Sequence, residues 1–314
     1  MTIQFMEPLN RAWGRMKAAL FQPFDLHKWF VVGFNAFLVA LMDGNHGSGG
    51  GRISKDGNFG AFIHFPREAW LWLQAHPFWA TAIIFGIVVA IAVVVVLTWV
   101  SSRGVFMFLD NVAHDRAEIA KPWREYQKEG NSLFVWRLLF GLVTFAVIGG
   151  ILVLFFVWGA AIYDRGWGWD EPVLLIVGLG LAVLAVVLVL SYVVLFLKDF
   201  VAALMYKNRI SCVAAWRLFL DLFKKYPMHF LGYGLLIFLL MILFVIAVIF
   251  AGFGTCCIGF IVLAIPYIST VVTLPVWYTY RAFSLEFMAQ FGPEYDVFPK
   301  PAAETAAAPA APAV

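Results

Sequence analysis

Long apolar runs constrain the fold of this chain more than any other feature. Residues 78–100, FWATAIIFGIVVAIAVVVVLTWV, contain no charged side chain. A helix needs about 20 such residues to cross roughly 30 Å of bilayer hydrocarbon. Several other runs approach or exceed that length, and only 13% of the chain is charged, against about a quarter in soluble domains. The sequence therefore predicts an all-α membrane protein that crosses the bilayer several times.

Polar junctions divide the chain into six apolar stretches, and each is predicted to form a transmembrane helix. They cover residues 27–42, 78–100, 133–162, 173–197, 230–250 and 260–280. The first stretch is short for a bilayer, so its flanking residues are expected to contribute. The sixth contains Pro266 and Pro275, which membrane helices tolerate when neighbouring groups satisfy the freed carbonyls.

The basic residues are distributed unequally between the two sides of these helices. On the side of the termini lie Arg11, Arg15, Lys17, Lys28, Arg103, Arg116, Lys121, Arg124, Lys128, Arg137, Lys198, Lys207, Arg209, Arg217, Lys224, Lys225, Arg281 and Lys300. On the other side lie Arg52, Lys55, Arg67 and Arg165. Because cytoplasmic loops carry the excess of lysine and arginine, both termini are predicted to be cytoplasmic.

An internal repeat accompanies this topology. Trp13, Trp123 and Trp216 each lie in a basic segment that precedes a pair of predicted spans. The second span of each pair ends in a basic residue followed by an apolar continuation: Arg103-GVFMFL, Lys198-DFVAAL and Arg281-AFSLEF. The pattern predicts three tandem units, each an amphipathic surface helix plus a helical hairpin, over residues 7–114, 115–208 and 209–291. Residues 1–291 then form one membrane domain, and the Pro/Ala-rich residues 292–314 form a disordered tail.

Residues 212–225 predict a helix that lies along the membrane surface. Its expected apolar face contains Val213, Trp216, Leu220 and Phe223, widened by Phe219 and Leu222. Its expected polar face contains Arg217, Asp221, Lys224 and Lys225. Basic residues near anionic lipid contribute roughly 1 kcal/mol each. Arg217, Lys224 and Lys225 are therefore expected to contact anionic headgroups at the cytoplasmic face.

Two further features have both a structural and a functional interpretation. Arg103, Lys198 and Arg281 are expected either to bind lipid headgroups or an anionic substrate, or to act as anchors that snorkel to the lipid phosphates. The sixth span, with its prolines and its hydroxyl side chains between residues 267 and 273, is either a gating helix or a structural kink. Asp25, Asp110, Asp199 and Glu286 lie at cytoplasmic boundaries, where they are expected to be solvated or paired with nearby bases.

Several functional classes receive no support from the residue pattern. Neither the three cysteines nor the histidines have the spacing of a metal site, and no arrangement of nucleophile, base and acid indicates catalysis. No carboxylate lies near the middle of a predicted span, which argues against an ion-coupled pump. There is no basic nucleic-acid-binding motif. We expect a protein that is not an enzyme, has no cofactor or metal, and does not bind nucleic acid.

The stretch LFQPFDLHKWFVVGFNAFLVALMDG at residues 20–44, followed by the glycine-rich HGSGGG, resembles an uncharacterised family of bacterial multi-pass integral membrane proteins. The overall plan is also similar to the membrane domain attached to some glycerophosphoryl diester phosphodiesterases. The hydrolase domain of those enzymes has no counterpart here. The resemblance therefore implies a location in the bacterial inner membrane and carries no activity across.

These features favour a non-enzymatic structural, scaffold or lipid-interacting membrane protein whose partners are membrane lipids. The alternative is a transporter or channel for a small solute or lipid that uses the kinked sixth helix. A polar cavity that reaches the middle of the membrane would favour transport, whereas a tightly packed, dry bundle would favour a scaffold.

Overall fold

The computed structural model describes residues 3–42, 59–165, 170–255 and 258–298. Within these ranges the chain is helical apart from short connections, and it contains no β-strand. The elements are α1 (Met6–Phe21), α2 (Leu26–Ala40), α3 (Phe59–Ala75), α4 (Pro77–His114), α5 (Ala120–Glu125), α6 (Gln127–Asp164), α7 (Asp170–Phe196), the π-helix η1 (Leu197–Val201), α8 (Ala202–Asn208), α9 (Cys212–Lys225), α10 (Pro227–Gly254), α11 (Ile258–Leu263), α12 (Pro266–Val272) and α13 (Leu274–Ala289).

Four helical stretches are long and apolar enough to cross a membrane. They are Pro77–His114, Gln127–Ala161, Val177–Asn208 and Pro227–Gly254. They overlap the second to fifth predicted spans, and the first three continue well beyond the apolar core into the segments that carry the basic residues. The chain is therefore a membrane-embedded, all-α protein.

The first and sixth predicted spans differ from this pattern. Helix α2 has only 15 residues and begins where the Asp25 carboxylate accepts a hydrogen bond from the His27 backbone N–H at 2.8 Å. The sixth span is not one helix but three, because Pro266 and Pro275 each lack the N–H that a continuous helix requires. Helices α12 and α13 each begin with one of these prolines in the first turn, where that missing N–H costs nothing.

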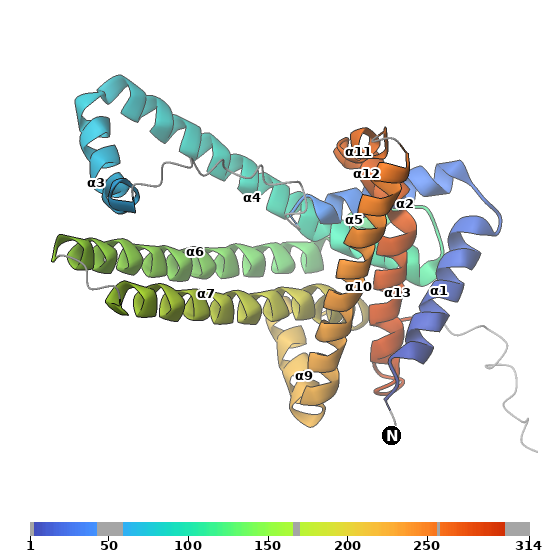
Figure 1. Cartoon of the computed structure of the whole chain (residues 1–314). Helices are drawn as coiled ribbons and strands as arrows, with labels where there is room; N and C mark the ends of the chain where they lie inside the picture. The colour runs from blue at the N-terminus through green and yellow to red at the C-terminus, as the bar shows by residue number, and fades with distance from the viewer. Residues whose placement is uncertain (1–2, 43–58, 166–169, 256–257, 299–314) are drawn as a thin grey trace, which may run out of the picture.

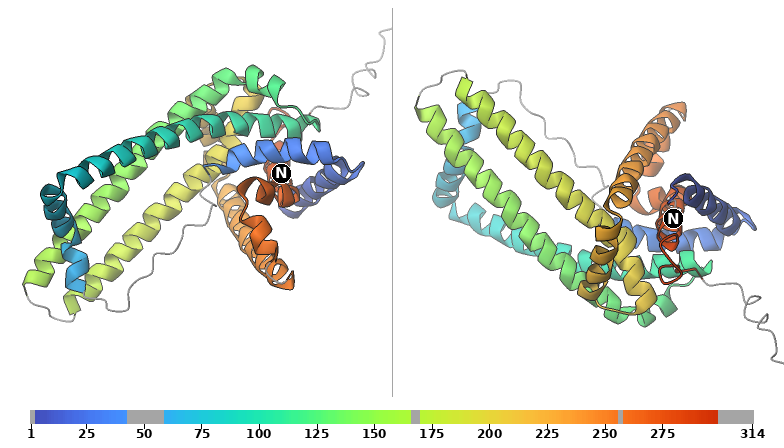
Figure 2. Two further views of the ribbon diagram at one scale, coloured as in Figure 1. Left: turned by 90° about the horizontal axis from the view of Figure 1, so that it is seen from above. Right: turned by 90° about the horizontal axis from the view of Figure 1, so that it is seen from below.

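The long helices diverge in direction, apart from one adjacent pair. Helices α6 and α7 run side by side, α4 diverges from them, and α10 points in a different direction (Figures 1 and 2). At most 6% of the residues in their most apolar stretches are buried in the protein. The apolar surface of the four helices is thus open to the surrounding lipid.

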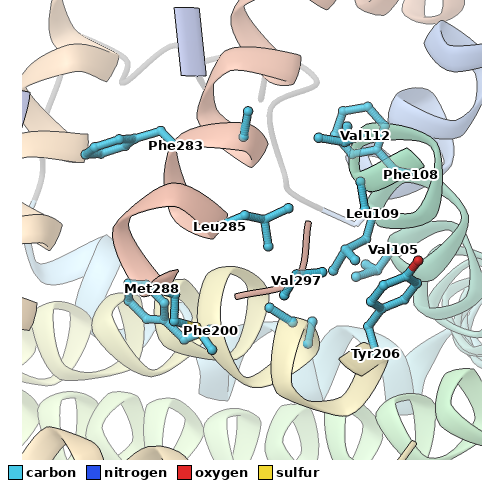
Figure 3. Close-up of a cluster of buried hydrophobic side chains, with 14 of the residues drawn as sticks. Val105, Phe108, Leu109, Val112, Phe200, Tyr206, Phe283, Leu285, Met288 and Val297 are labelled. Carbon is cyan, nitrogen blue, oxygen red and sulfur yellow. The ribbon is translucent and has the colours of Figure 1, made fainter. Parts of the chain in front are cut away.

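The packed core lies instead where three apolar segments meet, namely those that directly follow Arg103, Lys198 and Arg281 (Figure 3). Val105 and Leu109 of α4, Phe200 of η1, and Phe283 and Leu285 of α13 are all fully buried. These side chains come from the continuations GVFMFL, DFVAAL and AFSLEF. The three similar segments of the sequence are thus neighbours in space, and their apolar residues form one cluster.

Glycine allows α2 to pack closely against its neighbours in this region. A Cβ atom on Gly104 of α4 would lie 2.6 Å from the Leu38 Cβ, and a Cβ atom on Gly33 of α2 would lie 2.7 Å from a Val271 methyl group. Real Cβ atoms do not approach this closely. The short helix α2 is therefore held between α4 and α12 by backbone-to-side-chain contact at two glycines.

The packed part of the chain extends past the expected boundary at residue 291. The Lys207 ammonium donates a hydrogen bond to the Pro293 carbonyl at 2.8 Å. Val297 and Phe298 are buried, and the Arg15 guanidinium lies 3.7 Å from the centre of the Phe298 ring. The prediction of a disordered tail from residue 292 is wrong as far as Phe298, and its remainder falls on residues 299–314, outside the described residues.

Candidate functional site

A π-helix follows the fourth predicted span directly, and it contains a charged pair. Helix η1 connects α7 to α8, and the Ala202 N–H bonds to the Leu197 carbonyl five residues earlier. This wider turn contains Lys198 and Asp199. Single π-turns inside helices are rare and often occur at functional sites. The turn therefore directs attention to the surroundings of these two side chains.

Arg281 of α13 connects to this turn. Its Nη1 donates a hydrogen bond to the Lys198 carbonyl oxygen at 2.7 Å and lies 4.0 Å from the Asp199 Oδ1. The other Asp199 oxygen accepts a hydrogen bond from the Tyr233 hydroxyl of α10 at 3.0 Å. Arg281 is only 3% exposed. It is thus a buried structural cation and does not extend to the membrane surface as a snorkelling anchor would.

A cavity of about 80 Å³ lies beside this cluster. Lys198, Asp199 and Arg281 supply the charged part of its lining. Its other walls are almost entirely apolar and come from α2, α4, α7, α10 and α13, with Trp277 and Tyr280 of α13 among them. The Lys198 ammonium lies 5.7 Å from the centre of the Trp277 ring. The cavity therefore combines apolar walls with a charged edge, which suits an amphiphilic ligand.

Arg103, the third predicted member of this set, lies apart from the cavity. Its guanidinium carbon is 4.5 Å from the centre of the Trp99 ring and 5.0 Å from that of Trp123. Its Nη2 donates a hydrogen bond to the Asn131 side chain at 3.2 Å. The structure thus brings Lys198 and Arg281 together and places Arg103 between two tryptophans.

The predicted lipid-contacting residues of α9 are exposed. Arg217, Lys224 and Lys225 all lie on the outer surface of the helix, and the Lys224 ammonium is 3.9 Å from the Asp221 carboxylate. The apolar face is rotated from the predicted one. Helix α9 buries Cys212, Ala215, Phe219 and Leu222, whereas Val213 is 56% and Leu220 43% exposed.

This rotation follows from the aromatic side chains beneath α9. Phe219 packs against Phe196, Phe200 and Phe230, at ring-centre distances of 5.1, 5.5 and 5.2 Å. Aromatic pairs at such distances stabilise a packed core beyond their buried area. The helix therefore turns its phenylalanines toward the protein and leaves Val213, Leu218 and Leu220 outside.

Asp110, Asp199 and Glu286 are buried and paired, whereas the fourth boundary carboxylate, Asp25, is exposed at the start of α2. Glu286 lies 2.5 Å from the Arg15 Nε and 3.4 Å from the Arg11 Nε, which joins α13 to α1. Asp110 accepts a hydrogen bond from the Tyr206 hydroxyl at 2.7 Å and lies 3.5 Å from the Arg116 guanidinium. These acids are not solvated. Each fixes one of the three converging segments to another part of the chain.

Sequence reasoning missed Trp277 and Tyr280, which line the cavity, and Tyr233, which donates a hydrogen bond to Asp199. Trp277, Tyr280 and Arg281 follow the i, i+3, i+4 spacing of one helix face, and this spacing was the available signal. Tyr233 gave no signal because its partner Asp199 is 34 residues away in the chain. Within the described ranges, no group of three His, Cys, Asp or Glu side chains has the arrangement of a metal site.

A family model described as a family of unknown function (DUF7544) matches residues 4–297, nearly the whole chain. No curated protein and no solved structure matches the chain. These comparisons show no link to the glycerophosphoryl diester phosphodiesterases.

Proposed function

We propose that this chain, which belongs to the DUF7544 family of unknown function, is a non-enzymatic, lipid-interacting component of a bacterial inner membrane. The observation that carries the proposal is the separation of the apolar stretches from the packed core. At most 6% of the residues in those stretches are buried, while the core lies at the ends of the helices. Lipid is the environment that matches such a surface, since exposed apolar area of this size is unfavourable in water.

The cytoplasmic face supplies the second part of the proposal. Arg217, Lys224 and Lys225 are exposed on α9. Beside them on the helix are the exposed aliphatic side chains of Val213 and Leu220. An exposed helix with basic and aliphatic residues binds anionic lipid through both charge and apolar burial. Anionic phospholipids are the proposed partners.

We further propose six membrane-inserted segments in three tandem units, with both termini in the cytoplasm. The spatial clustering of GVFMFL, DFVAAL and AFSLEF supports the repeat, because equivalent segments of three units would converge in this way. The distribution of basic residues supports the orientation. In this arrangement α2 and the helices α11 to α13 enter the bilayer as the two shorter segments.

The alternative, a transporter that uses the broken last span, gains little support from the hydroxyl groups of that span. The Ser269, Thr270 and Thr273 hydroxyls donate hydrogen bonds to backbone carbonyls of their own segment, at 2.8, 2.8 and 2.7 Å. Serine and threonine hydroxyls that bond back to their own helix in this way do not present free donors to a pathway. The break is therefore better explained as a structural kink than as a polar pathway.

Lipid analysis of the purified protein tests the proposal. The protein is extracted in mild detergent, and the phospholipids that remain bound are compared by mass spectrometry with those of the source membrane. We expect enrichment of anionic phospholipids. The combined variant Arg217→Glu, Lys224→Glu and Lys225→Glu is expected to lose at least half of that enrichment, because each charge reversal replaces attraction with repulsion.

The matched control is the variant Arg67→Glu and Arg165→Glu, which reverses exposed charges on the proposed outer side. It is expected to retain the enrichment. Bound lipid with the composition of the bulk membrane, or equal losses in both variants, would contradict the proposal.

A further inference from the structure

We propose that Arg103 binds the phosphate group of an anionic phospholipid. Three side chains complete the site: Trp99 of α4, Trp123 of α5 and Asn131 of α6. The inference rests on the proposed function and assigns one lipid to one position, separate from the exposed basic face of α9. It depends on the setting of the guanidinium, its level in the membrane and the helix faces beside it.

The guanidinium of Arg103 is held in a fixed position. Its carbon lies 4.5 Å from the centre of the Trp99 ring and 5.0 Å from that of Trp123, and arginine stacks favourably on aromatic faces. The Asn131 side-chain oxygen accepts hydrogen bonds from the Arg103 Nη2 at 3.2 Å and from the Trp99 Nε1 at 3.3 Å. A group that is ordered before its ligand arrives loses less entropy on binding.

The positive charge of Arg103 is not balanced within the described parts of the chain. There, no carboxylate forms an ion pair with it, and its Nε is buried without a hydrogen-bond partner. Arg15 and Arg281, in contrast, lie beside Glu286 and Asp199. Drawing a charge out of water is unfavourable unless it is paired. Guanidinium N–H groups form strong charge-assisted hydrogen bonds with phosphate oxygens, so a phosphate would supply the missing negative charge.

The level of Arg103 in the membrane identifies the source of this phosphate. Arg103 follows the apolar run 78–100 by three residues, and that run is long enough to cross about 30 Å of hydrocarbon. The residues directly after it therefore lie at the level of the lipid headgroups. Tryptophan is enriched at this level, and two tryptophans accompany Arg103. The anion that a bilayer presents there is the phosphate diester of a phospholipid.

Lys128 of α6 favours a headgroup that lacks an ammonium group. It is exposed and precedes Asn131 by three residues, a spacing that makes side chains neighbours on a helix. The carboxylates of Glu125 and Glu129 both lie within ion-pair distance of Arg209, so they are engaged elsewhere. The Lys128 ammonium would attract a phosphate and repel the amine of a zwitterionic headgroup. The site therefore selects an anionic lipid such as phosphatidylglycerol.

The helices beside the site present apolar faces to an acyl chain. A Cβ atom on Gly130 would lie 2.9 Å from the Arg103 Cγ, so α4 and α6 touch here, and they diverge beyond this point (Figures 1 and 2). Val96 precedes Arg103 by seven residues and Leu138 follows Asn131 by seven, so each lies two turns away on the same helix face. Val96 is 57% and Leu138 40% exposed. An acyl chain attached to the bound phosphate would lie along these two faces.

Photo-crosslinking in nanodiscs tests the site. The full chain, in phosphatidylcholine nanodiscs, is irradiated with a trace of phosphatidylglycerol that carries a diazirine in the upper half of one acyl chain. Labelled peptides are identified by mass spectrometry, and we expect them to be those that contain Val96 and Leu138. Excess unlabelled phosphatidylglycerol is expected to reduce this labelling at least fivefold. Phosphatidylethanolamine with the same acyl chains, or inorganic phosphate, is expected to reduce it less than twofold.

The variant Asn131→Asp distinguishes a phosphate site from a structural anchor. Aspartate retains the oxygen that accepts hydrogen bonds from Arg103 and Trp99, but its charge pairs with the guanidinium and repels a phosphate. We expect at least fivefold less labelling, with a melting temperature no lower than that of the unmodified protein. Asn208→Asp adds the same charge at an exposed position on α8. It is the matched control and is expected to retain the labelling.

Removal of the cation itself gives a second variant. Arg103→Gln is expected to reduce labelling at least fivefold. Thermal melting verifies that the protein is folded.

Full labelling of folded Asn131→Asp protein, or labelling spread along all the exposed helices, would overturn the site. Equal competition by phosphatidylethanolamine would overturn the selection for an anionic headgroup, and competition by inorganic phosphate would overturn the assignment to a lipid. The combined charge reversal of Arg217, Lys224 and Lys225 is expected to leave this labelling unchanged. The failure of this site and the failure of the proposed function can therefore be told apart.

Discussion

The Arg281 guanidinium donates a hydrogen bond to the Lys198 backbone carbonyl at 2.7 Å, and this contact joins α13 to the π-turn η1. Two of the three converging segments are thus held together by a buried cation on one and the widened backbone of the other. The same guanidinium faces Asp199. The fold of the packed core therefore depends on charged groups as well as on apolar packing.

Replacement of Arg281 is expected to destabilise the protein strongly. Arg281→Met removes the hydrogen bond and leaves Asp199 buried without its cationic partner, which costs about 3 kcal/mol when a buried ion pair is broken. The exposed Arg217→Met is the control and is expected to change the free energy of unfolding by less than about 0.5 kcal/mol. Thermal or denaturant unfolding in detergent measures both. Equal stability of the two variants would show that Arg281 is only a surface anchor.

Glu286 is expected to hold the N-terminal helix in place. Its side chain is 4% exposed and pairs with both Arg11 and Arg15 of α1. Glu286→Gln removes the charge, and we expect α1 to exchange its amide hydrogens at least tenfold faster, as measured by hydrogen exchange and mass spectrometry. Glu7→Gln, which disrupts only an exposed pair with Arg11, is expected to have little effect. Unchanged exchange in Glu286→Gln would contradict this role.

The hydrogen bond from Tyr206 to Asp110 is expected to be the stronger of two similar contacts. Tyr206→Phe removes a 2.7 Å bond to a buried carboxylate, and such charge-assisted bonds contribute about 1.5–3 kcal/mol. Tyr126 donates to the same oxygen at 3.4 Å, so Tyr126→Phe is expected to cost less. Unfolding midpoints of the two variants provide the comparison. A larger loss in Tyr126→Phe would reverse the assignment.

Cys212 is expected to be unreactive in the folded protein. Burial raises the pKa of its thiol to about 12, from an ordinary value of 9.0, against a smaller opposing effect of Arg137. Because the folded-state pKa is the higher one, the stability contribution is complete below pH 9 and is lost as the pH rises toward 12. In a Cys256→Ser, Cys257→Ser background, maleimide is expected to label Cys212 at pH 8 only after denaturation. Rapid labelling of the folded protein would contradict this.

The four long helices were predictable because their apolar runs are long and uninterrupted. The two shorter segments were harder, since the effect of Pro266 and Pro275 depends on whether neighbouring groups support a continuous helix. Here three separate helices form, and the Ser269 and Thr273 hydroxyls bond to backbone carbonyls within this segment. The apolar run itself does not indicate whether such a segment forms one helix or several.

The candidate site was predictable only in part. Lys198 and Arg281 stood out as charges next to apolar runs, but their equivalence with Arg103 suggested three similar anchors. The difference between them arises from tertiary partners. Arg281 lies beside Asp199, which also accepts a hydrogen bond from Tyr233. Arg103 instead lies over the rings of Trp99 and Trp123. No local pattern in the sequence specifies which of these environments each residue meets.

The accessibility of single cysteines tests the proposed arrangement of three units most directly. The native cysteines are replaced by serine, and one cysteine is introduced at a time at an exposed position: Arg67, Arg165 or Thr255 on the proposed outer side, and Lys121, Asn208 or Glu294 on the cytoplasmic side. An impermeant maleimide is applied to intact spheroplasts. We expect labelling at positions 67, 165 and 255, and labelling at positions 121, 208 and 294 only after the membrane is permeabilised. Protection of position 67 or 255 in intact spheroplasts would show that α2 or the segment from α11 to α13 does not cross the membrane, and would contradict the three-unit arrangement.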